Sequence, residues 1–391
     1  MSERADVFEA SDWSEAQAHA RETARGFARS ELMPLAPEID EKERIPRGLW
    51  QRLGKHQLLG VPLPAAHGGQ GLDLLCAATV LEELAVACAS TAWSVAVHTL
   101  LGGWMIARHG TEEQQKRLLP DLCSGRKIAA FALTEPEAGS DAAAVRARAV
   151  PAGGAYKVNG TKLFVTNAHL ADVLLIAAGT TPEGGRKGLS LLLVERGAQG
   201  LTIGAGEKKL GLRGADWGEV RFENVAVPAA NRLGPEHGGY PLLLEALAAG
   251  RLGVAALALG LAEAAFEASV AHASSRRQFG RPIGVFQSVS HTLADMSVGL
   301  EAGRSLVYHA ALAPGGVGGP HARLASSAKL FATEQASRIC AQAVQLLGGL
   351  GTLREAMVER YFRDAKMLEI GMGTSQIQRE VIARRILGKL E

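Results

Sequence analysis

A segment rich in hydroxyl groups and small residues follows an apolar run near residue 130. It reads Phe131-Ala132-Leu133-Thr134-Glu135-Pro136-Glu137-Ala138-Gly139-Ser140-Asp141. The backbone N–H groups of such a turn, with the hydroxyls of Thr134 and Ser140, suit the carbonyl groups of a planar heterocycle or a phosphate. Taken alone, the residues favour an ordinary surface turn over a binding site, and both interpretations remain open.

Arginines cluster where a long apolar helix is predicted to end. The run Arg276-Arg277-Gln278-Phe279-Gly280-Arg281-Pro282-Ile283 contains a glycine stop with a proline beyond it. Clustered arginines at a helix C-terminus are usually a solvated face that the helix dipole favours. They also suit a diphosphate, because guanidinium groups bind phosphate oxygens in bidentate fashion.

A Gly-x-Gly near the C-terminus separates a charged helical run from a further helix, in Ile370-Gly371-Met372-Gly373-Thr374-Ser375-Gln376-Ile377-Gln378. It predicts a tight helix-to-helix corner, where glycine lets the backbone approach a ligand closely. The glycine-rich residues 62–71 follow no strand, so we expect a turn there and not a phosphate loop. His98 lies in an apolar helix and is predicted to be a core residue. We find no Ser/His/Asp constellation, no metal-ligand cluster and no nucleic-acid motif.

Three stretches of different periodicity must position these residues, and they predict an α+β fold. Residues 1–125 are expected to form an N-terminal all-α domain, with helices at 11–33 (ended by Pro34), 46–59, 73–89, 91–109 and from Thr111. Residues 126–235 contain short strand-like runs that imply a small sandwich or barrel, and Asn159-Gly160 predicts a hairpin turn. Residues 236–391 predict a four-helix bundle, with helices at 241–274, 285–312, 320–347, 353–369 and from about 375.

Composition describes an ordinary soluble globular protein, with 47% hydrophobic and 21% charged residues. The net charge of +2 gives no reason to expect nucleic acid or an anionic membrane as a partner. Charged residues interrupt the most apolar stretch, 242–265, so we expect no membrane span. Cys76, Cys88, Cys123 and Cys340 are expected to be free thiols in a reducing compartment. The N-terminus lacks a signal or transit composition, so we expect a cytoplasmic protein.

Five motifs resemble those of the acyl-CoA dehydrogenase family. Thr134–Asp141 is similar to the family's TEPxAGSD, and Phe164-Val165-Thr166-Asn167 to its (W/F)-x-T-(N/S) strand. Arg276–Ile283 is similar to RxQFGxPI, Gln345–Gly351 to QxxGGxG, and Gly373–Gln378 to the GTxxIQ part of IYEGTxxIQ. The order of helical domain, β domain and helical bundle is also that of the family, so the resemblance covers nearly the whole chain.

The resemblance implies that FAD is the cofactor. It implies that the flavin ring is bound or lined by Phe131, Leu133, Thr134, Gly139, Ser140, Phe164 and Thr166, the last near N5 and O4 of the ring. For Phe164 alone, a core position in a hairpin is an equal alternative. The adenosine end would be held across a subunit boundary by Arg276, Gln278, Phe279, Gln287, Gln345, Gly348 and Gly349, and the cofactor set is completed by Thr374 and Gln376. Substrate contacts are expected from Ser140, Arg251, Met372 and Gly373. Such FAD binding implies at least a homodimer, and the usual assembly is a homotetramer.

The chain departs from the family at the residue that does the chemistry. Where the family carries Tyr-Glu, this chain has Gly371-Met372, and that Glu is the usual base for the α-proton of the acyl thioester. Other members place the base immediately before the arginine that corresponds to Arg251, where this chain has Gly250. No catalytic residue is therefore assigned. Trp217 stands where the family has a small or hydroxylated residue, and it either narrows the acyl entrance or is a surface-loop residue.

Four functions are compatible with a flavin site that lacks its base. The first, and favoured, is dehydrogenation of an acyl thioester, carried by coenzyme A or a carrier protein as in secondary metabolism, with an acidic substrate proton or a base from elsewhere. The second is a flavin-dependent monooxygenase. The third is a non-redox lyase or cyclase, and the fourth a non-catalytic subunit of a hetero-oligomer. An electron-transfer flavoprotein or a reductase is the expected redox partner of an active enzyme.

Overall fold

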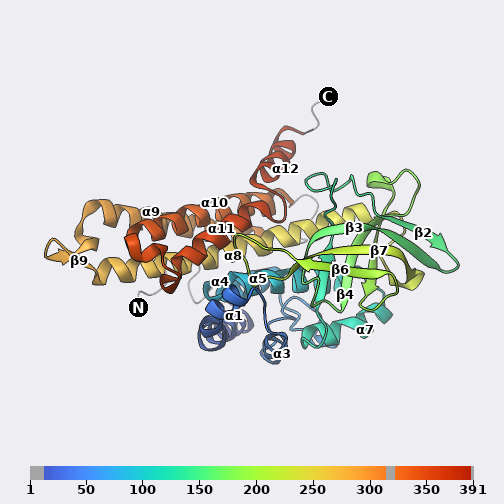
Figure 1. Ribbon diagram of the computed structural model, residues 1–391, viewed down its shortest axis with the longest axis horizontal. Coiled ribbons are helices and arrows are strands. Elements are labelled where there is room, and N and C mark those ends of the chain that lie inside the picture. Colours follow the sequence, from blue (N-terminus) through green and yellow to red (C-terminus); the bar gives the residue numbers. More distant parts are fainter. Residues whose placement is uncertain (1–12, 314–321, 389–391) are drawn as a thin grey trace.

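The computed structural model describes residues 13–313 and 322–388, and their elements follow the predicted order of helices, strands and helices (Figure 1). The N-terminal helices are α1 (Glu15–Phe27), α2 (Ala36–Lys42), α3 (Arg47–Lys55), α4 (Leu74–Ala87), α5 (Ala89–Ala96), α6 (Trp104–His109) and α7 (Glu112–Cys123). The strands are β1 (Ala129–Ala132), β2 (Arg148–Ala152), β3 (Ala155–Thr166), β4 (Val173–Gly179), β5 (Leu189–Glu195), β6 (Leu201–Gly206), β7 (Trp217–Pro228) and β8 (Arg232–Leu233). The C-terminal helices are α8 (Gly239–Ser275), α9 (Gln287–Ala311), α10 (Ala322–Leu347), α11 (Val358–Ile370) and α12 (Ser375–Leu387). The fold class predicted from the sequence is confirmed.

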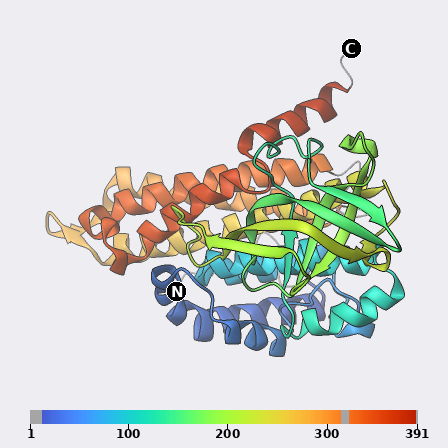
Figure 2. The ribbon, with the colours of Figure 1, turned by 45° about the vertical axis from the view of Figure 1, so that its right-hand side comes forward.

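The N-terminal helices lie beneath both the bundle and the sheet (Figure 2). Thr111 begins α7 with a capping box, in which its side chain accepts from the backbone N–H of Gln114 and the Gln114 side chain accepts from Thr111 N–H. The prediction that Pro34 ends the first helix is wrong. The chain passes through a π-helical turn and then a 3₁₀ turn that contains Pro34, and it continues directly into α2. Proline is tolerated there because it stands in the first turn of a helical segment, where its missing N–H is not needed.

The strands form one sheet path, β6-β7-β3-β2-β4-β5-β8, with β1 parallel to β4. Only one bridge, Arg148 with Gly179, joins β2 to β4. The two halves on either side of that bridge are antiparallel ladders apart from the β1–β4 pair.

The predicted hairpin turn at Asn159-Gly160 is wrong. Both residues lie inside the continuous strand β3, where the register with β7 shifts between Val158 and Gly160. Gly160 has φ of +146°, and a Cβ there would lie 2.7 Å from the Cβ of Ala147. The pair therefore marks a bulge. The hairpin turn lies at Gly153-Gly154, between β2 and β3, where both glycines have positive φ.

The C-terminal helices form an elongated bundle with β9 (Arg277–Gln278) and β10 (Arg281–Pro282) at one end and the sheet beyond the other (Figure 1). Its central helix, α8, has 37 residues and is long and apolar enough to cross a membrane by length and composition. Of its most apolar window, 78% is buried inside the protein, as expected for a core helix. The predicted linker at residues 314–320 lies outside the described residues.

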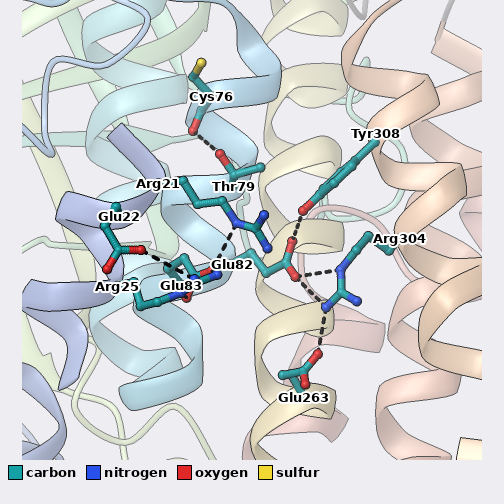
Figure 3. A network of polar contacts seen from close by, with 10 residues as sticks. All are labelled: Arg21, Glu22, Arg25, Cys76, Thr79, Glu82, Glu83, Glu263, Arg304 and Tyr308. Carbon is teal, nitrogen blue, oxygen red and sulfur yellow. Dashed lines mark hydrogen bonds and ion pairs between the residues drawn. The ribbon is translucent and has the colours of Figure 1, made fainter. Parts of the chain in front are cut away.

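A buried network of ion pairs joins α4 to the bundle (Figure 3). Arg304 of α9 donates to Glu82 of α4 through Nε and Nη2, at 3.0 and 2.8 Å, and Nη2 also donates to Glu263 of α8 at 2.8 Å. Tyr308 donates its hydroxyl proton to the other oxygen of Glu82 at 2.9 Å. Beside this network, Arg21 and Arg25 of α1 pair with Glu83.

Candidate functional site

The segment after β1 is fastened to β3 by a buried ion pair. Lys162 Nζ donates to Glu135 Oε1 at 2.7 Å and to the carbonyl of Leu133 at 3.0 Å, and both charged side chains are almost fully buried. Burial lowers the pKa of Lys162 to about 8, against the raising effect of the Glu135 carboxylate. The backbone N–H of Leu163 donates to the Thr134 carbonyl at 2.8 Å. The two predicted flavin-contact segments therefore lie side by side.

Phe164 and Thr166 present different surfaces at the end of β3. The Phe164 side chain is 53% exposed, on a backbone with φ of +54°. An apolar ring this exposed beside a polar turn fits a face that a planar ligand would cover. Thr166 is buried, and its Oγ1 accepts a hydrogen bond of 2.9 Å from Nε1 of Trp93, on α5.

An aromatic row connects these two residues. The ring of Trp217 lies 6.2 Å from that of Phe164 and 6.2 Å from that of Trp93, between centroids. The Trp217 Nε1 atom is buried with no hydrogen-bond partner in the part of the chain that the structure describes. Trp217 is therefore packed into the site and is not a free surface-loop residue.

The predicted corner between α11 and α12 is confirmed. Met372 and Gly373 both have positive φ, and Thr374 begins α12 as its N-cap. Lys329 of α10 fastens the corner, because its Nζ donates to the carbonyls of Glu369 and Gly373 at 2.8 and 2.9 Å. Burial lowers the pKa of Lys329 to about 7, with Glu369 acting in the opposite direction and Arg251 in the same one.

The two positions at which the family resemblance places a base touch each other. A Cβ on Gly250 would lie 3.0 Å from Sδ of Met372 and 3.1 Å from Cδ2 of Leu101. The thioether of Met372 therefore covers Gly250, and neither residue has useful basicity. Arg251 is buried, its Nη1 lies 3.4 Å from Ser326 Oγ, and its Nε has no partner among residues 13–313 and 322–388. Burial lowers the pKa of Arg251.

A glycine at 371 is required by Trp93. A Cβ added to Gly371 would lie 2.3 Å from Cη2 and 3.1 Å from Cζ3 of the Trp93 indole. Real Cβ atoms do not approach this closely, so no other residue fits at 371 while Trp93 keeps its position. Trp93 was not predicted as a site residue, since a single Trp in an apolar helix resembles any core residue.

The remaining predicted cofactor residues lie at the far end of the bundle. Arg276, Gln278 and Phe279 follow α8 and are exposed, Phe279 by 91%. Gln345, Gly348 and Gly349 are exposed at the end of α10, which runs parallel to α8, and Gln287 begins α9 nearby. A Cβ added to Gly348 or Gly349 would meet no atom within 4 Å. The same is true of a Cβ added to Gly139, in the segment after β1. Gln376 is exposed on α12.

The residues thus fall into two separate sets within one chain. At a helical rise of 1.5 Å per residue, Gly250 and Arg276 lie about 39 Å apart along α8. The first set contains the residues at the β1–β3 edge and at the corner. The second contains those at the β9–β10 end.

His98 is a satisfied core residue, as predicted. Its Nδ1 accepts from the N–H of Ala129 at 3.0 Å, so Nε2 carries the proton and donates to the Leu122 carbonyl at 3.1 Å. Complete burial lowers the pKa of His98 to about 4. Within the described residues, no group of three or more His, Cys, Asp or Glu side chains is placed to hold a metal ion.

A cleft lies elsewhere. It has a volume of about 680 Å³, lies between α2–α3 and the sheet, and includes Ile39, Arg47, His169 and Asp216 in its lining. None of the predicted cofactor or substrate residues lines it, so we assign it no role in the chemistry.

Sequence models of three domains match this chain in succession. They are the acyl-CoA dehydrogenase N-terminal domain at residues 14–126, the middle domain at 130–225 and the C-terminal domain at 237–387. The matches span the helical, β and bundle parts described above.

Individual relatives are similar over nearly their full length. A short-chain-specific acyl-CoA dehydrogenase of Clostridium acetobutylicum is 42% identical over 367 residues, which are 94% of this chain and 96% of the relative. The structure of butyryl-CoA dehydrogenase from Megasphaera elsdenii has a TM-score of 0.93 at 36% identity, covering 96% of this chain and 99% of that one. The prolyl acyl carrier protein oxidase AnaB has a TM-score of 0.91 at 35% identity, covering 96% and 100%.

Proposed function

Because this chain belongs to the acyl-CoA dehydrogenase family, we propose that it dehydrogenates an acyl thioester in a site that has no carboxylate at either usual base position. The observation that carries the proposal is the contact between Met372 and Gly250, which fills the place of the base with a thioether. The chain is a flavoenzyme of this family, and FAD is its cofactor.

The first set of residues fits the flavin ring. Gly139 leaves open space, Phe164 offers an exposed apolar face, and Trp217 has an unpartnered buried N–H beside it. When bound, FAD supplies the acceptor for the hydride that leaves Cβ of the acyl group. Thr134, Ser140 and Thr166 are the residues that would hold the ring. Met372, Gly373 and Arg251 would bound the space for the acyl group, which we call the acyl chamber.

The separation of the two sets supports a homo-oligomeric site. Along α8, Arg276 lies about 39 Å from Gly250 at the other set, a separation that argues against one cofactor spanning both sets within a chain. A second copy would bring its Arg276, Gln278 and Phe279 to the FAD held by the first. The guanidinium groups suit the diphosphate, and the 91% exposure of Phe279 suits a surface that a partner covers. We therefore propose a homodimer, or a homotetramer built from two such dimers.

The missing base restricts which acyl groups can lose their α-proton. General-base catalysis contributes about 10²–10⁴ in rate. A thioester whose α-proton is acidic in itself needs less of this help, so activated acyl groups are favoured over simple fatty acyl chains. The carrier is coenzyme A or a carrier protein, as in pathways of secondary metabolism. The electron acceptor is an electron-transfer flavoprotein, a reductase or oxygen.

Anaerobic titration of the purified holoprotein with a panel of thioesters tests this proposal. We expect bleaching of the oxidised flavin absorption by at least one thioester, with one equivalent of enoyl product per flavin. The panel contains simple acyl groups and acyl groups with an electron-withdrawing β-substituent, each on coenzyme A and on a carrier protein. A yellow protein that no thioester bleaches would contradict dehydrogenation.

The same preparation separates the alternatives. If dithionite-reduced protein incorporates oxygen from O₂ into a thioester, the protein is a monooxygenase. Conversion of a thioester without any change of flavin oxidation state would indicate a lyase or cyclase. A colourless protein that does not take up added FAD would indicate a non-catalytic subunit.

A further inference from the structure

The side chain of Trp93 spans the distance between the flavin-contact strand and the α11–α12 corner. It rises from α5 and is 3% exposed. One edge of the indole meets Thr166 of β3, and the opposite edge lies against Gly371. The residue therefore touches both the strand proposed to hold the ring and the corner proposed to bound the acyl chamber.

Three contacts hold the indole in one orientation. The hydrogen bond from Nε1 to Thr166 Oγ1 is 2.9 Å long and buried at both ends. The ring of Trp217 packs against it at 6.2 Å and 45°. The Gly371 backbone blocks the far edge. Rotation of the ring away from Thr166 would leave the buried N–H without its hydrogen bond, which disfavours that movement.

Trp93 and a side chain at 371 exclude each other. A Cβ at 371 would lie 2.3 Å from the indole. The Trp93 side chain, which comes from α5, therefore occupies the space that a side chain at 371 would need. On the other side of the corner, Met372 fills the space over Gly250. Large apolar side chains therefore occupy the space next to both Gly371 and Gly250.

We propose that Trp93 is the residue that limits the length of the acyl group, and that the substrate is a short acyl thioester. This inference rests on the proposed function, because it places the acyl group beside Met372. A fixed indole at this position ends the chamber where a flexible side chain would yield to a longer chain. Trp93 acts here by excluding methylene groups.

Binding of S-alkyl pantetheine thioethers to the FAD-loaded protein tests the proposal without turnover. These probes carry the arm that coenzyme A and carrier proteins share, and they lack the thioester carbonyl. Isothermal titration compares a butyl with an octyl probe on the wild type, Trp93→Ala, Trp93→Phe and the control Trp104→Ala. Trp104 is a similarly buried Trp of α6.

Each methylene that the site accommodates adds about fourfold in affinity. We expect the octyl probe to bind the wild type about tenfold or more below the affinity that this gain per methylene, added to the butyl probe, would give. In Trp93→Ala the octyl probe should bind at least about tenfold more tightly than in the wild type, while the butyl probe changes by less than about threefold. Trp93→Phe should bind the octyl probe with an affinity between those of the wild type and Trp93→Ala. It replaces the alanine variant in the test if that variant does not fold. Trp104→Ala should keep the wild-type ratio.

Two results would overturn the inference: equal gain per methylene up to octyl in the wild type, or an unchanged ratio in both Trp93 variants. Failure of the proposed function looks different. In that case no thioester reduces the flavin, while the length preference and its change in the Trp93 variants persist.

Discussion

At the scale of single residues, the contact between Met372 and Gly250 determines what the site lacks. Both residues occupy positions at which the family resemblance places the base, and a Cβ on Gly250 would lie 3.0 Å from the Met372 sulfur. Met372 already has φ of +56°, so another non-glycine residue there adds no new type of backbone strain. Gly250 is different, because any Cβ there presses on the Met372 sulfur.

We therefore expect Met372→Glu to accelerate anaerobic flavin reduction by a simple short acyl thioester by about 10²- to 10⁴-fold. Stopped-flow absorbance of the flavin measures this rate. Met372→Gln has nearly the same shape without the basicity and is the matched control. Gly250→Glu should accelerate flavin reduction only together with Met372→Ala, because the shorter alanine leaves space for the new glutamate side chain. If Met372→Glu keeps its FAD and gains nothing, the chamber does not present the α-carbon to position 372.

The buried neutral His98 predicts a specific acid sensitivity. Its pKa is about 4 in the folded protein and about 6.5 in the unfolded chain, so below pH 6.5 the unfolded state binds a proton that the folded state refuses. Its effect on stability is absent above pH 6.5, and as pH falls to 4 the free energy of unfolding drops by up to about 3 kcal/mol.

Thermal unfolding of the wild type and His98→Gln between pH 4 and 7.5 measures this. The glutamine variant should be less stable at pH 7.5, because it loses part of the bonding to Ala129 and Leu122, and its stability should decrease less with acid. Parallel curves for the two proteins would show that His98 does not titrate in this range.

At the scale of elements, the Glu82–Arg304–Glu263 network fixes how α4, α8 and α9 pack. Removing Arg304 leaves two buried carboxylates without their cation, which costs about 3–5 kcal/mol. We expect Arg304→Met to lower the unfolding temperature strongly. The exposed pair Arg384–Glu380 is the control, and Arg384→Met should cost less than about 1 kcal/mol.

Thermal unfolding monitored by circular dichroism compares the two variants. The triple variant Arg304→Met, Glu82→Gln, Glu263→Gln should recover part of the loss, because it also removes the two buried negative charges that Arg304 neutralises. Equal effects of Arg304→Met and Arg384→Met would contradict the assignment of a buried network.

Element type was predictable wherever the hydrophobic period was long, as in α8 and α10. The errors arose where tertiary packing overrode the local preference of the residues. Asn159-Gly160 has the residues of a hairpin turn, but pairing of β3 with β7 on both sides of it turns the same residues into a bulge. The corner at Gly371–Thr374 was predictable because glycines mark it. Trp93 and Lys329 were not. Trp93 contacts a residue 73 positions away, and Lys329 contacts residues 40 and 44 positions away.

At the scale of the whole molecule, the separation of the two residue sets is the basis for the proposed homo-oligomer. The bundle holds them about 39 Å apart along α8, so under that proposal a second copy completes the cofactor site. Phe279 is the most exposed large apolar side chain described, at 91%, and it lies in the segment that would meet the partner's FAD. Burial of a Phe side chain contributes about 1.5–3 kcal/mol, and a carboxylate in its place would be desolvated without a partner.

We therefore expect Phe279→Asp to shift the protein toward smaller species and to lower its FAD content together. Light scattering after size exclusion gives the mass, and the ratio of flavin absorption to protein absorption gives the FAD content. Val150→Asp is the matched control, because Val150 is also exposed, by 59%, but lies on β2 away from the bundle. Its mass and FAD content should equal those of the wild type. A Phe279→Asp protein that is monomeric and fully loaded with FAD would mean that one chain holds the cofactor alone, and the two sets would then need separate explanations.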